Sequence, residues 1–137
     1  MELLHKDLTD KILKAFYEVY NQLNYGFREK IYQKSLAYEL RQLGLVAEEE
    51  KPISVYYKGL LMGEYRADLV VEGKIILELK AQSTIKDPHE AQLLHYLRAM
   101  PIEVGLVLNF GIKPEFVRKV YDNSRKKFNL PKSELSS

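Results

Sequence analysis

The chain has 137 residues, of which 46% are hydrophobic and 29% are charged, a composition typical of one globular domain. It has no cysteine, which excludes disulfides, thiolate metal ligands and a cysteine nucleophile. Its apolar runs fall far short of the ~20 residues that cross a bilayer, and its first residues lack the pattern of a signal peptide. We therefore expect a cytoplasmic protein that does not bind membranes. The net charge of +2 permits a nucleic-acid partner without requiring one.

The N-terminal third predicts two helices joined by a short loop. Over residues 8–23, apolar side chains recur at spacings of three and four, which is the period of an amphipathic helix. A second such pattern runs over residues 27–43 and ends at Gly44, a residue typical of helix C-termini. We expect the buried face of this second helix to carry Ile31, Leu36, Leu40 and Leu43.

The middle third predicts an antiparallel meander of three strands. Residues 53–57 are β-branched and aromatic, and residues 61–71 and 75–81 follow, with a turn signal at residues 72–74. Alternation along the second strand predicts one face that carries Tyr65, Ala67, Leu69 and Val71, and an opposite face that carries Glu64, Arg66, Asp68 and Val70.

The C-terminal third predicts a helix and then a buried strand. The helix begins at Asp87 as N-cap, with Glu90 completing a capping box, and it ends before Pro101. Residues 104–108 form an apolar run of strand length. Residues 116–121 fit either an edge strand or a short helix.

The resulting order, α-α-β-β-β-α-β, predicts an α+β or mixed α/β protein with helices on the faces of one sheet. We expect a single domain over residues 1–121 and a polar, flexible tail over residues 122–137.

A charged pair on the third strand points to chemistry. Glu78 and Lys80 face the same way, while Leu77 and Leu79 face the opposite way into a core. The plainer explanation is a solvent-exposed sheet face, on which glutamate and lysine are common.

Asp68 on the second strand gives this pair a possible partner. A two-residue turn would place Asp68 opposite Leu77, on the wrong face, whereas a three-residue loop over residues 72–74 places it opposite Glu78. Opposed carboxylates repel unless a cation lies between them. Such a site suits Mg²⁺ or Mn²⁺, which can polarise a phosphodiester and activate water, and Lys80 would then stabilise charge on the phosphate.

Two helices carry further polar residues at helical spacing. Gln92 and Tyr96 are four apart and share one helix face, and Glu29 and Tyr32 are three apart on another helix. Taken alone, these residues fit ordinary roles: surface polarity for Gln92 and Tyr96, a half-buried aromatic for Tyr32, and a first-turn glutamate for Glu29.

Together these residues resemble a known pattern. Asp68, Glu78-x-Lys80 and Gln92-x-x-x-Tyr96, preceded by a helical glutamate, look like the PD-(D/E)XK nuclease superfamily. More narrowly, residues 26–32 read as GxxExxY, and the chain resembles the GxxExxY protein family of that superfamily. The arginine and alanine before Asp68 depart from the nominal pattern, which has a proline there.

The resemblance implies a restriction-endonuclease-like α-β-β-β-α-β core and a Mg²⁺ or Mn²⁺ site. Glu29, Asp68 and Glu78, helped by the Leu79 carbonyl, would hold the metal, Lys80 would be the catalytic lysine, and Gln92 and Tyr96 would position the site or the substrate.

The resulting hypothesis is a metal-dependent nuclease, most simply a deoxyribonuclease that is completed by a homodimer or a protein partner. The alternatives are a nuclease-fold module that binds nucleic acid or protein without cutting, and an unrelated enzyme or structural protein. The last alternative would hold if Asp68 and Glu78 lay on opposite faces of the sheet.

Overall fold

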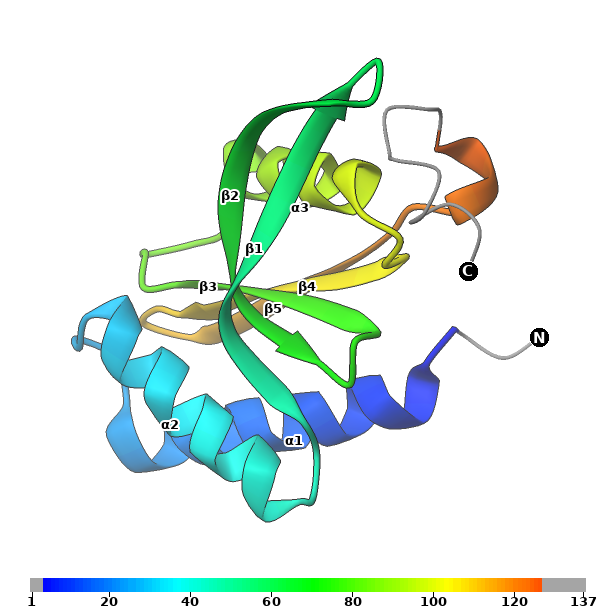
Figure 1. Cartoon of the computed structure of the whole chain (residues 1–137). Helices are drawn as coiled ribbons and strands as arrows, with labels where there is room; N and C mark the ends of the chain where they lie inside the picture. The colour runs from blue at the N-terminus through cyan, green and yellow to red at the C-terminus, as the bar shows by residue number, and fades with distance from the viewer. Residues whose placement is uncertain (1–3, 127–137) are drawn as a thin grey trace.

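The computed structural model describes residues 4–126, which form three α-helices and one five-stranded sheet (Figure 1). The elements in chain order are α1 (Lys6–Leu23), α2 (Glu29–Gln42), β1 (Ala47–Tyr57), β2 (Leu60–Val71), β3 (Ile75–Lys80), α3 (Asp87–Ala99), β4 (Val104–Phe110), β5 (Pro114–Val120) and the short 3-10 helix η1 (Asn123–Arg125). None of the helices in this range is long and apolar enough to cross a membrane.

The strands lie in the order β1-β2-β3-β4-β5. The pairs β1–β2, β2–β3 and β4–β5 are antiparallel, whereas β3 and β4 are parallel because α3 connects them as a crossover. The predicted meander and the predicted mixed sheet flanked by helices are therefore confirmed. The undecided segment, residues 116–121, lies mostly in an edge strand, β5.

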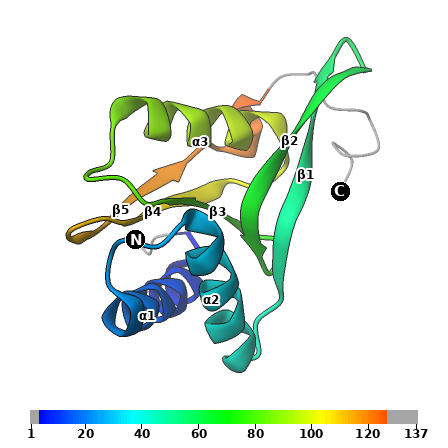
Figure 2. The ribbon, with the colours of Figure 1, turned by 90° about the vertical axis from the view of Figure 1, so that its left-hand side faces the viewer.

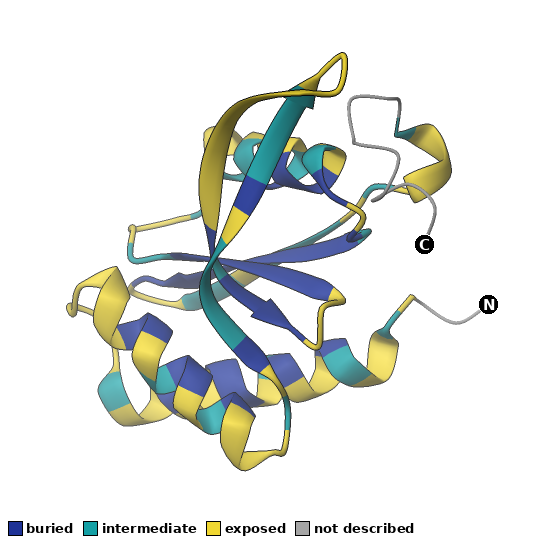
Figure 3. Cartoon of the chain, in the orientation of Figure 1, coloured by how far each residue is buried: buried dark blue, intermediate teal, exposed yellow. Residues whose placement is uncertain are grey.

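Helices cover both faces of the sheet. Figure 2 shows α1 and α2 together on one face and α3 on the other, and Figure 3 shows that the buried residues lie mainly on the central strands and the inner sides of the helices. Two apolar clusters result, which we call the α1/α2 core and the α3 core. The first includes Phe16, Tyr32, Leu69, Leu77 and Phe110, and the second includes Ile53, Ala67, Val70, Ile76, Leu93 and Leu97.

The buried face of α2 differs from the predicted one. Its buried residues are Tyr32, Gln33, Leu36, Ala37 and Leu40, whereas Ile31 and Leu43 are 45% and 47% exposed. The helix is rotated so that Tyr32 enters the α1/α2 core, where its ring stacks on Phe110 at a centroid distance of 4.1 Å. The larger aromatic contact area explains why Tyr32, and not Ile31, turns inward.

The predicted capping of α3 is wrong in detail. The N-cap position falls on Lys86, and the Lys86 backbone N–H donates to Nδ1 of His89 at 3.1 Å. Glu90 instead forms an ion pair with Lys119 of β5 at 2.8 Å. His89 therefore takes the role that the sequence assigned to Glu90.

The long strands β1 and β2 bend sharply in the middle. Leu69 packs in the α1/α2 core and Ala67 in the α3 core, although a flat strand would place both on one face. The bend coincides with Glu50, which lies across from Asp68 and has the left-handed φ of 51°. A left-handed residue within a strand interrupts the pleat and adds twist. The predicted face shared by Tyr65, Ala67, Leu69 and Val71 is therefore wrong.

The predicted tail falls partly on described residues. Residues 127–137 lie outside the described range. Within the described part, Lys126 Nζ donates to the carbonyls of Met100 and Ile102 at 2.7 and 2.8 Å, next to the C-terminal end of α3.

The Gly111→Ala substitution is expected to destabilise the fold by about 1–3 kcal/mol. A Cβ at Gly111 would lie 2.3 Å from the backbone oxygen of Gln82, so the loop after β3 would have to move. In the control Gly63→Ala, the added Cβ meets no atom of the described residues within 4 Å. Urea unfolding of both variants beside the wild type tests this expectation, and equal midpoints for the two variants would contradict it.

Candidate active site

The register of β2 and β3 brings two carboxylates together. Val71 pairs with Ile75 and Leu69 with Leu77, so the three-residue loop over residues 72–74 is confirmed, and Asp68 comes next to Glu78. Glu72 and Gly73 adopt left-handed φ values of 55° and 64° within this loop. Both carboxylates lie on the α3 side of the sheet, since the neighbouring Val70 and Ile76 belong to the α3 core.

Burial dominates the electrostatics of this pair. Glu78 is only 4% exposed, and burial together with the Asp68 carboxylate raises the pKa of Glu78 to about 9. Burial also raises the pKa of Asp68, although the backbone N–H of Leu79 opposes this by donating to Asp68 Oδ2 at 2.7 Å. Within the described part of the chain, Glu78 Oε1 is buried without a hydrogen-bond partner.

A divalent cation fits this donor set. A buried carboxylate oxygen without a partner is costly, and both a proton and a cation relieve that cost. Two carboxylates are hard oxygen ligands of the kind that Mg²⁺ and Mn²⁺ prefer. The carboxylates of Asp68 and Glu78 could therefore supply two oxygen ligands to such a cation.

The structure does not bring the third predicted carboxylate into this pair. Among residues 4–126, no group of three histidine, cysteine, aspartate or glutamate side chains is close enough to hold a metal ion. Glu29 is exposed and is the first residue of α2. Its carboxylate still acts on the pKa of His89 at the start of α3, so it faces the same region of the molecule as α3.

Lys80 is linked to α3 through a chain of side chains. Its Nζ donates to Gln92 Oε1 at 3.4 Å, and Gln92 Nε2 donates to the Tyr96 hydroxyl at 3.0 Å. Tyr96 is 6% exposed, and burial together with the Glu78 and Asp68 carboxylates raises its pKa to about 12. The hydroxyl of Tyr96 therefore stays protonated beside the carboxylate pair.

His89 also lies near this centre, which the sequence did not indicate. Burial lowers its pKa, and the positive charges of Lys80 and Lys86 lower it further, while Glu29 opposes them. A histidine alone on a helix carries no motif, so only the position of α3 in the fold reveals that it is close to Lys80.

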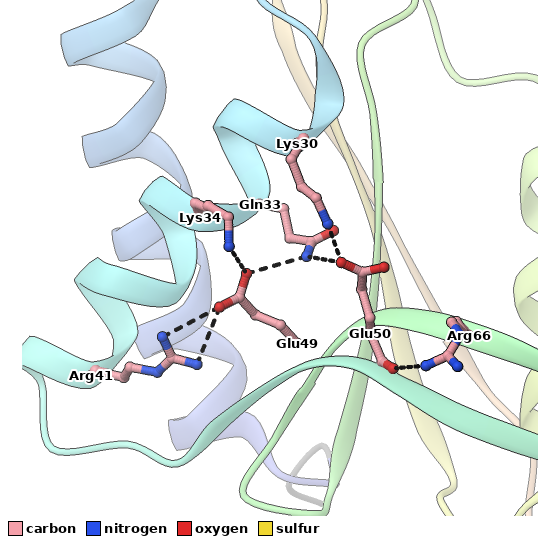
Figure 4. A network of polar contacts seen from close by, with 7 residues as sticks. All are labelled: Lys30, Gln33, Lys34, Arg41, Glu49, Glu50 and Arg66. Atoms are coloured by element: carbon pink, nitrogen blue, oxygen red, sulfur yellow. Dashed lines mark hydrogen bonds and ion pairs between the residues drawn. The ribbon is translucent and has the colours of Figure 1, made fainter.

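A second feature missed by the sequence is the network in Figure 4, which joins α2 to the bend of β1. Lys30 forms an ion pair with the Glu50 carboxylate, and Gln33 Nε2 donates to Glu49 at 3.2 Å and to Glu50 at 3.5 Å. Arg66 donates to the Glu50 carbonyl at 3.2 Å. The glutamate run of residues 48–50 carries no motif by itself, and the signal that could have indicated this network is the row of polar and basic residues at helical spacing on α2.

A sequence profile of the PD-(D/E)XK nuclease superfamily matches residues 6–120. The chain belongs to the PD-(D/E)XK nuclease superfamily. The match spans all three helices and all five strands of the described range. No curated protein and no solved structure gives a significant match.

Members of the PD-(D/E)XK superfamily generally use divalent metals, in agreement with the donor set of Asp68 and Glu78. The narrower resemblance to the GxxExxY family stays a prediction. In the structure, the tyrosine of that motif, Tyr32, is fully buried, and its hydroxyl donates to the Asn24 carbonyl at 2.5 Å. This tyrosine therefore holds the α1–α2 loop that precedes Glu29.

The Glu78→Gln substitution is expected to stabilise the metal-free protein at pH 8. The pKa of Glu78 is about 9 in the folded protein and 4.5 in the unfolded chain. Between pH 4.5 and about pH 9, Glu78 therefore holds a proton in the folded state and releases it on unfolding, so the free energy of unfolding falls as the pH rises. The loss reaches at most about 1.4 kcal/mol per pH unit from this group. Glutamine removes this slope, whereas the control Glu64→Gln, at an exposed position, keeps it.

Urea unfolding in EDTA between pH 6 and pH 8.5 measures these slopes. The same pH dependence in wild type and Glu78→Gln would show that the folded protein does not hold that proton.

Proposed function

We propose that this protein is a metal-dependent nuclease that hydrolyses phosphodiester bonds in DNA. The observation that carries the proposal is the buried Asp68–Glu78 pair, whose Glu78 oxygen lacks a partner among the described residues, beside a lysine held by Gln92. Membership of the PD-(D/E)XK superfamily supports a nuclease and, with it, a nucleic-acid partner.

Asp68 and Glu78 would hold the cation, Mg²⁺ or Mn²⁺, with help from the Leu79 carbonyl and from Glu29. When bound, such an ion polarises the phosphodiester and lowers the pKa of a coordinated water. The Leu79 N–H keeps Asp68 in place by donating to its Oδ2. Glu29 lies outside the carboxylate pair, but it faces the α3 side of the sheet, where its charge acts on the pKa of His89.

Lys80 would stabilise the negative charge that develops on the phosphate and would orient the attacking water. The Gln92 carbonyl oxygen holds the ammonium group in place, and Tyr96 in turn holds Gln92. A side chain held by neighbours contributes more to catalysis than a mobile one, because it needs no reorganisation during the reaction. Lys86 and His89 add donors on the same side, where a phosphate backbone would approach.

A small domain offers little surface for gripping a long duplex, so a second copy or a protein partner would complete the binding surface. A cytoplasmic location stays a prediction.

The second candidate is a nuclease-fold module that binds nucleic acid or protein without cutting it. One observation favours it: among the described residues, no three carboxylates come together as a metal site. A cleavage assay decides between the two candidates.

The Lys80→Ala variant is expected to cut DNA at least about 100-fold more slowly than the wild type, because one donor to the developing charge is lost. The assay uses labelled single-stranded, duplex and branched DNA with Mg²⁺ or Mn²⁺. The control is Lys74→Ala, which removes an exposed lysine at the opposite end of β3. No cleavage by folded, metal-bound wild type would favour the binding module.

Mn²⁺ binding is expected to release close to one proton at pH 7, because Glu78, with a pKa of about 9, holds a proton in the metal-free protein. Titration calorimetry in two buffers with different ionisation enthalpies measures this release. The Glu78→Gln variant should bind Mn²⁺ weakly and release almost no proton. Tight binding by that variant would remove Glu78 from the ligand set.

A further inference from the structure

Tyr65 is an exposed aromatic residue next to Tyr96, at the rim of the proposed site. It is 53% exposed, and its ring centroid lies 5.4 Å from that of Tyr96, with 41° between the ring planes. Tyr96 is joined through Gln92 to Lys80. An exposed aromatic ring is therefore two side chains away from the proposed catalytic lysine.

The bend at Glu50 is what brings Tyr65 there. Tyr65 pairs with Ile53 across the strands, and Ile53 belongs to the α3 core. Without the bend, Tyr65 would share a face with Leu69, which packs against α1 and α2. The twisted outer half of the β1–β2 hairpin instead reaches past α3, as Figure 1 shows.

The exposed apolar surface continues from Tyr65 along this hairpin. Leu60, Leu61 and Met62 are 64%, 55% and 57% exposed. Gly63 separates Leu61 from Tyr65, and a Cβ added there would meet no described atom within 4 Å. No described atom therefore covers the strand at Gly63, between these two side chains.

The chemistry of this surface fits a nucleobase. A flat aromatic ring stacks on the face of any base, and an ammonium group binds the phosphate that is attached to that base. Here the ring is Tyr65 and the charges are those of Lys80 and Lys86, which both act on His89. Within a duplex, the base faces are covered by neighbouring base pairs, so a rim tyrosine stacks on an unpaired base and not on a paired one.

We propose that Tyr65 stacks on an unpaired nucleobase next to the scissile phosphate, which makes single-stranded DNA the preferred substrate. The inference rests on the proposed function and deepens it, because it names the strand form that the site takes. Tyr65 determines specificity by contacting the substrate, and it is not one of the metal ligands.

The test compares the binding of a labelled single-stranded oligonucleotide and a blunt duplex of equal length by fluorescence anisotropy in EDTA. The Tyr65→Leu variant keeps apolar cover over Tyr96 but loses the ring, and Tyr65→Phe keeps the ring. The control Tyr38→Leu removes a tyrosine that is 58% exposed on α2. Cleavage with Mn²⁺ is measured on the same proteins.

Tyr65→Leu is expected to weaken single-strand binding about tenfold or more, with duplex binding unchanged. Tyr65→Phe and Tyr38→Leu should stay within about twofold of the wild type, since ring stacking is retained in both. If Tyr65→Leu weakened the binding of both DNA forms equally, or weakened neither, the inference would be overturned. Cleavage of DNA by the wild type would in that case still support a nuclease. Wild type that neither binds nor cuts DNA would overturn the proposed function as well.

A second measurement covers the case in which Tyr65→Leu fails to fold. A 2-aminopurine base moved stepwise along the oligonucleotide should lose fluorescence at one position when wild-type protein binds, because stacking on tyrosine quenches it. Binding without quenching at any position would overturn the stacking role of Tyr65.

Discussion

Glu78 lies almost fully buried beside a second carboxylate, and much of the surrounding structure is arranged to hold that pair. Its neighbours Leu77 and Leu79 are buried in the α1/α2 core, so β3 cannot rotate to expose Glu78 to solvent without exposing them as well. The register with Asp68 depends on the loop over residues 72–74, whose left-handed residues set the strand pairing. The pair opposes folding in the metal-free protein because like charges in a poorly solvated place must take up a proton. Strongly shifted pKa values of this kind cluster at functional sites.

The second constraint is the bend at Glu50, which lies across the strands from Asp68. A left-handed non-glycine residue costs of order 1–3 kcal/mol, and the contacts with Lys30, Gln33 and Arg66 hold it in place. Each exposed ion pair contributes little alone, but together these contacts tie α2, which begins with Glu29, to the strand beside Asp68. The same bend turns the outer hairpin over α3 and exposes Tyr65 beside Tyr96.

The loop after β3 is held in place by contacts with β4. Asn109, fully buried at the end of β4, donates to the Gln82 carbonyl and accepts from the Gln82 backbone N–H, both at 3.0 Å. Gly111 allows the backbone of this loop to pass close by. Because Gln82 comes two residues after Lys80, this reciprocal pair fixes the direction in which the chain leaves β3 and enters α3. The lysine and its partner Gln92 are thereby held at a set distance.

The sequence by itself determined the order and type of the elements from α1 to β4, the shared face of Glu78 and Lys80, and the shared face of Gln92 and Tyr96. These features follow from local periods of two and 3.6 residues, which act within one element. Only the tertiary structure decided which side of α2 is buried, how far Glu29 lies from the carboxylate pair, and that His89 approaches Lys80. The reversal of faces at Glu50 also could not be read from alternation, because one left-handed residue ends the period that the alternation assumes. Contacts between elements depend on twist and packing over long sequence distances, and no local pattern records them.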